Sequence, residues 1–224
     1  MRDFFDSIKE FIWDIIGYFL PGSYALILLS ACIDNSYFIE HAIETNSKDQ
    51  NFLIFLIISY IIGYVVYGLG ELKESIMSDK SYKKVIEEQV KKRKAFELSK
   101  EFISLDLKEK GSSQDINSAT VGDIRNIAMS FIPEQDQKIY TFQFRSDLCN
   151  NIGNISFLIG LFGLFAFFIS LFSSIVVFRL EVQNITLYVF LIISYCLLAK
   201  ARDRFYAISI SLPFSIFTAK FLSK

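Results

Sequence analysis

The chain has 224 residues, of which 52% are hydrophobic and 21% charged, and its formal net charge is −1. Its mean hydropathy of +0.38 excludes an ordinary soluble protein, while the charged fraction excludes a chain that lies wholly in lipid. We therefore expect a membrane protein with a sizeable aqueous part.

Residues 1–20 are predicted to form an amphipathic helix, because their apolar positions recur every three or four residues. The opposite face is acidic and carries Asp3, Asp6, Glu10 and Asp14. Pro21 and Gly22 then interrupt the pattern. Two geometries remain open: a helix in the membrane interface that kinks into the first span, or one kinked helix whose lower half lines an aqueous path. In the second geometry Glu10 and Asp14 are candidate pore residues, because rings of carboxylates in a symmetric oligomer attract cations.

Four apolar runs approach or reach the length of about 20 residues that an α-helix needs to cross a bilayer. They cover residues 11–33, 52–70, 155–178 and 182–199. Lysine and arginine are retained in the cytoplasm, and with the N-terminus inside only Lys48 and Arg179 fall outside. We therefore expect a multi-pass protein of the bacterial inner membrane, with both termini in the cytoplasm.

Two spans carry patterns that predict helix contacts. The second span has a tyrosine stripe formed by Tyr60, Tyr64 and Tyr67. These are candidate pore residues, although such stripes more often pack or anchor a helix at the interface. Small residues at helical spacing let backbones approach closely. They occur at Ser59 and Gly63 in the second span, and at Ser156, Gly160 and Gly163 in the third. Whether these contacts lie within one chain or between subunits is left open.

Residues 71–150 hold 14 of the 23 lysines and arginines and 14 of the 24 acidic residues, so we expect a helical cytoplasmic domain there. Residues 81–103 are predicted to form one amphipathic helix with a strongly basic stretch. Its basic side chains are Lys83, Lys84, Lys91, Lys92, Arg93 and Lys94. They are candidates for binding acidic lipid headgroups, a nucleotide or single-stranded nucleic acid. The alternative is a solvated helix face balanced by glutamates.

Two further helices are expected before the third span. Thr120 followed by Asp123 resembles a capping box and predicts a short helix. Pro133 suits the first turn of the next helix. No helix breaker follows before Gly153, so this helix is expected to continue into the third span.

The C-terminal segment, residues 200–224, is expected in the cytoplasm or the membrane interface. Residues 206–217 are apolar but interrupted by Pro213, and alternation of isoleucine and leucine with serine favours an extended piece. A short interfacial or packing helix is the alternative. A fifth crossing is disfavoured because it would carry Lys220 and Lys224 outside.

Residue types suited to catalysis or metal binding are scarce. The single histidine, His41, has no second imidazole or cysteine pair to complete a zinc site. The chain contains no serine nucleophile motif, dinucleotide fingerprint or paired intramembrane carboxylates. We therefore expect neither an enzyme nor a bound cofactor.

Three sets of short runs carry a resemblance to known proteins. They are Phe19-Leu20-Pro21-Gly22; Ser59-Tyr60-Ile61-Ile62-Gly63 followed by Gly68-Leu69-Gly70; and Phe144-Arg145-Ser146-Asp147. With the four-span architecture, they resemble small membrane effectors of bacterial anti-phage defence systems, of the Hailong or Kiwa type. The resemblance implies a homo-oligomeric ion channel or membrane-disrupting pore, gated at the cytoplasmic domain by a nucleotide or oligonucleotide. It also implies a separate partner enzyme that makes the signal.

Charged residues near the membrane are candidates for a latch. They are Arg145, Asp147, Arg202 and Arg204. The alternative function is a non-conducting membrane scaffold or sensor whose cytoplasmic helices recruit a protein partner. Ion flux is the measurement that separates the two functions.

Overall fold

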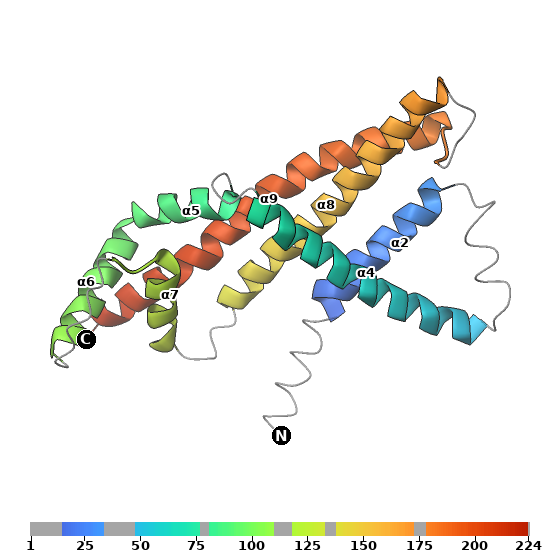
Figure 1. The fold of residues 1–224 in the computed structure, drawn as a ribbon. Coiled ribbons are helices and arrows are strands. Elements are labelled where there is room, and N and C mark those ends of the chain that lie inside the picture. The colour runs from blue at the N-terminus through green and yellow to red at the C-terminus, as the bar shows by residue number, and fades with distance from the viewer. Residues whose placement is uncertain are drawn as a thin grey trace. The chain divides into compact units, whose positions relative to one another are not determined.

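The computed structural model describes residues 15–33, 48–76, 81–109, 118–132, 138–172 and 178–223. Their regular secondary structure is helical, apart from one isolated antiparallel bridge between Ile33 and Phe178. In chain order the helices are η1 (Ile15–Phe19), α2 (Leu20–Cys32), α4 (Lys48–Ile76), α5 (Tyr82–Lys91), α6 (Lys94–Glu109), α7 (Val121–Ser130), α8 (Lys138–Ser170) and α9 (Val182–Leu222) (Figure 1). The prediction of an all-α fold is confirmed.

Four helical segments are long and apolar enough to cross a membrane. They are Ile15–Cys32, Phe52–Ile76, Ile139–Ser170 and Val182–Leu222. At ~1.5 Å per residue even the shortest extends about 27 Å, close to the hydrocarbon thickness of ~30 Å. The chain is therefore a multi-pass membrane protein, as predicted.

The chain divides into two compact units. The membrane unit comprises Met1–Ile76 and Asp147–Lys200, and the polar unit comprises Met77–Ser146 and Ala201–Lys224. The long helices α8 and α9 each contribute residues to both units. The polar unit is thus built from α5, α6 and α7 together with the first turns of α8 and the second half of α9.

In the membrane unit, η1 and α2 cross α4 with their backbones in contact. A Cβ atom added to Gly22 would lie 1.7 Å from the Ser59 carbonyl oxygen, and one added to Gly63 would lie 1.9 Å from that of Tyr18. No side chain fits in either place, so this crossing needs glycine on both helices. The small pair Ser59 and Gly63 therefore makes its close contact within one chain.

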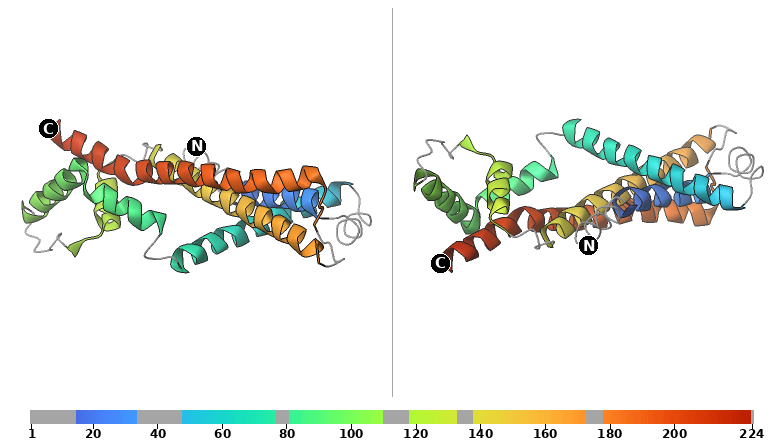
Figure 2. Two further views of the ribbon diagram at one scale, coloured as in Figure 1. Left: turned by 90° about the horizontal axis from the view of Figure 1, so that it is seen from above. Right: turned by 90° about the horizontal axis from the view of Figure 1, so that it is seen from below.

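Helices α8 and α9 lie side by side in the membrane unit, and they also approach each other closely at glycine residues (Figure 2). A Cβ atom added to Gly160 would lie 2.8 Å from the Tyr188 carbonyl oxygen, and one added to Gly163 would lie 2.5 Å from the Tyr188 ring. Tyr188 is fully buried, and its hydroxyl donates a hydrogen bond of 2.8 Å to the Arg179 carbonyl oxygen. The small residues of the third span therefore also pack within the chain.

The first span changes helix type at its start. The π-helical turn η1 leads directly into α2, and Pro21 lies in the first turn of α2, where its missing N–H costs no hydrogen bond. The predicted interruption at Pro21 and Gly22 therefore appears as a change from π-helix to α-helix just before the proline. Residues 1–14 of the predicted amphipathic helix lie outside the described residues.

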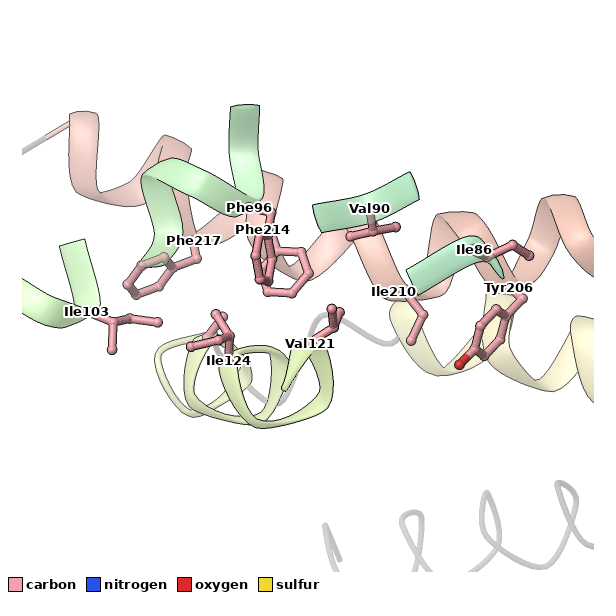
Figure 3. Close-up of a cluster of buried hydrophobic side chains, with 11 residues drawn as sticks. Ile86, Val90, Phe96, Ile103, Val121, Ile124, Tyr206, Ile210, Phe214 and Phe217 are labelled. Atoms are coloured by element: carbon pink, nitrogen blue, oxygen red, sulfur yellow. The ribbon is translucent and has the colours of Figure 1, made fainter. Parts of the chain in front are cut away.

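The core of the polar unit is formed by apolar side chains from four helices (Figure 3). Buried residues come from α5, α6, α7 and α9, and they include Ile86, Val90, Phe96, Ile103, Val121, Ile124, Tyr206, Ile210, Phe214 and Phe217. Aromatic rings from α6 and α9 meet here, with 5.1 Å between the ring centroids of Phe96 and Phe214. The second half of α9 is therefore an integral part of this core.

Of the two alternatives for residues 206–217, the extended piece is wrong and the packing helix is confirmed, because α9 continues as a helix to Leu222 and contains Pro213. Tyr206, Ile210, Phe214 and Phe217 recur at helical spacing and are all buried. Burying such side chains contributes about 1.5–3 kcal/mol each, whereas a proline inside a helix costs about 3 kcal/mol. Packing against the polar unit therefore outweighs the proline and the local alternation.

The expectation of one helix over residues 81–103 is also wrong, because α5 ends at Lys91 and α6 begins at Lys94. In an unbroken helix, the buried face of Ile86 and Val90 would continue to Lys94 and Glu97. A short turn separates the two helices and is closed by a 2.9 Å hydrogen bond from the Arg93 N–H to the Val90 carbonyl oxygen. The turn changes which residues of the following helix face the core. Phe96 then faces the core in place of a charged residue.

The predicted start of α7 is confirmed. The Thr120 hydroxyl accepts a hydrogen bond of 3.2 Å from the Asp123 N–H, and the Asp123 carboxylate accepts one of 2.9 Å from the Thr120 N–H. The Thr120 hydroxyl also lies 2.7 Å from the Asp123 carboxylate, and the hydrogen bonds that the carboxylate accepts from this hydroxyl and from the Thr120 N–H hold the pKa of Asp123 below its ordinary value. In the described part of the chain α8 begins at Lys138 and continues without a break to Ser170, which confirms the predicted continuity into the third span. The expected start of this helix at Pro133 lies outside the described residues.

Candidate functional site

Tyrosines gather where η1 meets α4. Tyr18 stacks on Tyr64 with 3.9 Å between ring centroids, and meets Tyr60 and Tyr67 edge to face at 6.3 Å and 5.6 Å. The hydroxyls of Tyr60 and Tyr64 are hydrogen-bonded to each other at 3.2 Å. We call these four residues the tyrosine cluster. Three of them are the predicted stripe, and Tyr18 is the member that sequence analysis missed.

Tyr60 and Tyr64 lie midway along their span, and not at either end. Tyr60 and Tyr64 follow Phe52, the first residue of the 25-residue span, by about 12 Å and 18 Å along the helix axis. Both side chains are exposed, by 37% and 45%. Interface anchors occupy the ends of a span, so anchoring does not explain these two residues.

The acidic pore candidates, Glu10 and Asp14, lie outside the described residues. The tyrosine cluster is therefore the part of the predicted pore site that the structure places.

A second polar group of the membrane unit joins α4 to α8 and α9. Lys73 donates hydrogen bonds to the Asn154 Oδ1 at 3.0 Å and to the Tyr195 hydroxyl at 3.4 Å, and its ammonium lies 5.4 Å from the centre of the Tyr195 ring. Gly70 lies one turn earlier on α4, beside the Asn151 side chain. The signal in the sequence was the polar face of Asn150, Asn151 and Asn154 at the start of an apolar run, which sequence analysis did not use.

The basic candidates lie at the two ends of α5. Lys83 and Lys84 are in its first turn, whereas Lys91 is its last residue and the other three follow it. Seven residues of helix separate the two groups by about 11 Å. The four side chains of residues 91–94 are exposed. Lys91 forms an ion pair with Glu88, and this charged hydrogen bond lowers the pKa of the glutamate.

Three of the predicted latch residues belong to the polar unit. The Arg202 guanidinium stacks 3.7 Å above the centre of the Tyr82 ring, and its Nε donates to Asp203 at 2.9 Å. Arg202 is 8% exposed, so this arginine is a packed element of the unit. Arg145 lies 5.8 Å from the ring centre of Phe142, and Arg204 is exposed. The fourth latch candidate, Asp147, falls in the membrane unit.

Another arginine, which sequence analysis did not single out, lies between α7 and α8. The Arg125 Nη2 donates a 3.1 Å hydrogen bond to the Gln143 Oε1, while its Nε is buried and has no hydrogen-bond partner among the residues that the structure describes. Burial lowers the pKa of Arg125. The near neighbour Tyr206 donates its hydroxyl to the Glu87 carboxylate at 3.1 Å.

No family model, curated protein or solved structure matches the chain. Among the described residues there is also no group of three His, Cys, Asp or Glu side chains that could hold a metal ion. The function is therefore argued from the arrangement of the chain's own side chains.

Proposed function

We propose that the protein is a homo-oligomeric membrane effector that conducts ions or perturbs the bilayer. A phosphate-bearing signal, a nucleotide or oligonucleotide made by a partner enzyme, controls it at the polar unit. The proposal follows the resemblance to anti-phage membrane effectors and places the protein in the bacterial inner membrane, with the polar unit and both termini in the cytoplasm.

The tyrosine cluster carries this proposal. Hydroxyl groups exposed at mid-depth in a span are disfavoured against lipid and are expected to face a partner helix or water. Because Tyr18 already covers one side of Tyr64, the exposed side is available to a second copy of the chain. In an oligomer, the α4 helices would then present the paired hydroxyls of Tyr60 and Tyr64 at a subunit contact or along a water-filled path.

The continuity of α8 and α9 supports the control step. Each helix contributes side chains to the polar unit and continues as a membrane span. Tyr206 and Phe217 of α9 pack in the polar core, while Tyr188 and Leu191 pack in the membrane core. A ligand that repacks the polar unit therefore acts on helices that also belong to the membrane unit.

Ion flux through the purified protein in liposomes tests the proposal, with and without nucleotides or short DNA. The double variant Tyr60→Phe/Tyr64→Phe removes only the two hydroxyls and is expected to change flux at least severalfold. Ile61→Val, on the same helix and also exposed, is the matched control and is expected to conduct like the wild type. Membranes that stay sealed under every condition would contradict the proposal and favour the non-conducting scaffold.

A further inference from the structure

Arg125 is a half-buried charge that has no carboxylate partner among the described residues. In the described part of the chain its hydrogen bond goes to the neutral Gln143 amide, and its Nε remains unpaired. Two carboxylates of the polar unit already have other partners, because Glu87 accepts from Tyr206 and Asp203 pairs with Arg202.

A partly buried charge without a charged partner destabilises the folded state. An arginine stays protonated in proteins, and a buried charge or buried donor without a partner loses its hydration without compensation. The lowered pKa of Arg125 has burial as its main cause and reflects the same cost. An anion at this position would restore both the charge balance and the missing hydrogen bond.

Further donors lie beside Arg125 on the first turns of α8. Gln143 uses its Oε1 to accept from Arg125, so its amide nitrogen is free to donate to another group. Tyr140 precedes Gln143 by three residues and thus lies on the same helix face, and it is 57% exposed. Burial lowers the pKa of Arg125, while Tyr206 and, to a smaller extent, Tyr140 act on it in the opposite direction, which indicates that the Tyr140 hydroxyl lies near the guanidinium.

We propose that Arg125, Gln143 and Tyr140 form a binding site for a phosphoryl group. Three donors on two helices suit the three oxygens of a phosphoryl group better than the two coplanar oxygens of a carboxylate. The site differs from the basic stretch at residues 91–94. It rests on the proposed function only in placing an anionic ligand on the polar unit, and its test does not use ion flux.

The phosphoryl group has two possible sources, a soluble phosphate ester or a lipid headgroup. The full-length protein in phospholipid-free detergent is titrated with pyrophosphate in one arm and with short-chain phosphatidic acid in the other, by calorimetry at constant ionic strength. Citrate is titrated as a carboxylate control. We expect saturable one-to-one binding of at least one phosphoryl probe, tighter than the binding of citrate.

Variants locate the binding. Arg125→Gln is expected to weaken it at least tenfold, because a hydrogen bond to a charged group is lost. Arg125→Lys keeps the charge but loses the Nε donor, so its affinity for the phosphoryl probe should lie between those of the wild type and Arg125→Gln. Lys108→Gln removes one positive charge from an exposed position in the last turn of α6 and is expected to bind within about twofold of the wild type. Tyr140→Phe, at an exposed position, should weaken binding about threefold. This variant tests the site if the Arg125→Gln protein does not fold.

Several results would overturn this site. They are the absence of saturable binding by both phosphoryl probes, undiminished binding by Arg125→Lys and Tyr140→Phe, equal losses in Lys108→Gln and Arg125→Gln, and tighter binding of citrate. Liposomes that stay sealed would count against conduction and leave this site intact.

Discussion

The crossing of η1 and α2 with α4 predicts opposite effects for the same substitution at two glycines of one helix. Gly63→Ala would place a methyl group 1.9 Å from the Tyr18 carbonyl oxygen, and Gly68→Ala would meet nothing within 4 Å. Both residues lie inside α4, so the gain in helix propensity, up to about 1 kcal/mol, is common to both variants.

The magnitude follows from the contact distance. Because carbon atoms essentially never approach a backbone oxygen closer than 3.0 Å, Gly63→Ala forces the two backbones apart by more than about 1 Å. Overpacking of this kind typically costs 1–3 kcal/mol, here against backbone atoms that cannot rotate away. We expect Gly63→Ala to be less stable than Gly68→Ala by about 2 kcal/mol or more.

Unfolding of the detergent-solubilised variants in a titration with sodium dodecyl sulfate, followed by circular dichroism, measures this difference. Gly68→Ala should unfold at the wild-type midpoint or above it, and Gly63→Ala clearly below it. Equal midpoints for the two variants would refute the close crossing of these helices.

Three predictions concern the polar unit. Arg202→Lys should lower the unfolding free energy by about 1–2 kcal/mol, measured by thermal unfolding, because an ammonium cannot stack on the Tyr82 ring as the planar guanidinium does; unchanged stability would contradict the stacking. Thr120→Ala should cost about 1 kcal/mol by removing the α7 cap, and a wild-type melting curve would contradict this. The pKa of Asp123 is lower in the folded state, so its carboxylate contributes to the free energy of unfolding above the unfolded pKa of about 3.9. This contribution is lost as the pH falls through the folded-state pKa. The difference in stability between the wild type and Thr120→Ala should therefore shrink in acid. Ser99→Ala should cost about 1–2 kcal/mol in chemical unfolding, because a buried hydroxyl joins α6 to α9, and a neutral effect would argue against that contact.

Local signals predicted the features that depend on neighbouring residues. The four spans follow from the length of the apolar runs, and the start of α7 follows from Thr120 and Asp123 three residues apart. Each of these depends on hydropathy or on a hydrogen bond within a few residues. Such information is present in the order of the amino acids.

The candidate sites were predictable only in part. The tyrosine stripe of α4 was visible as a spacing, but its contact with Tyr18 depends on the crossing of two helices. Lys73 and Arg125 were not singled out, because their partners Asn154 and Gln143 come from α8. No local pattern in the sequence predicts a contact with a residue 81 or 18 positions away.

The sequence by itself determined that this is an all-helical membrane protein with four spans and a polar helical insertion, because burial in lipid sets the length and hydropathy of a span. Tertiary structure decided where helices break and continue. It divided residues 81–103 at Lys92 and Arg93, and it carried α9 through Pro213. In both places the free energy gained by burying apolar side chains against distant helices exceeds the free-energy cost of overriding the local conformational preference. That gain exists only once the helices have packed.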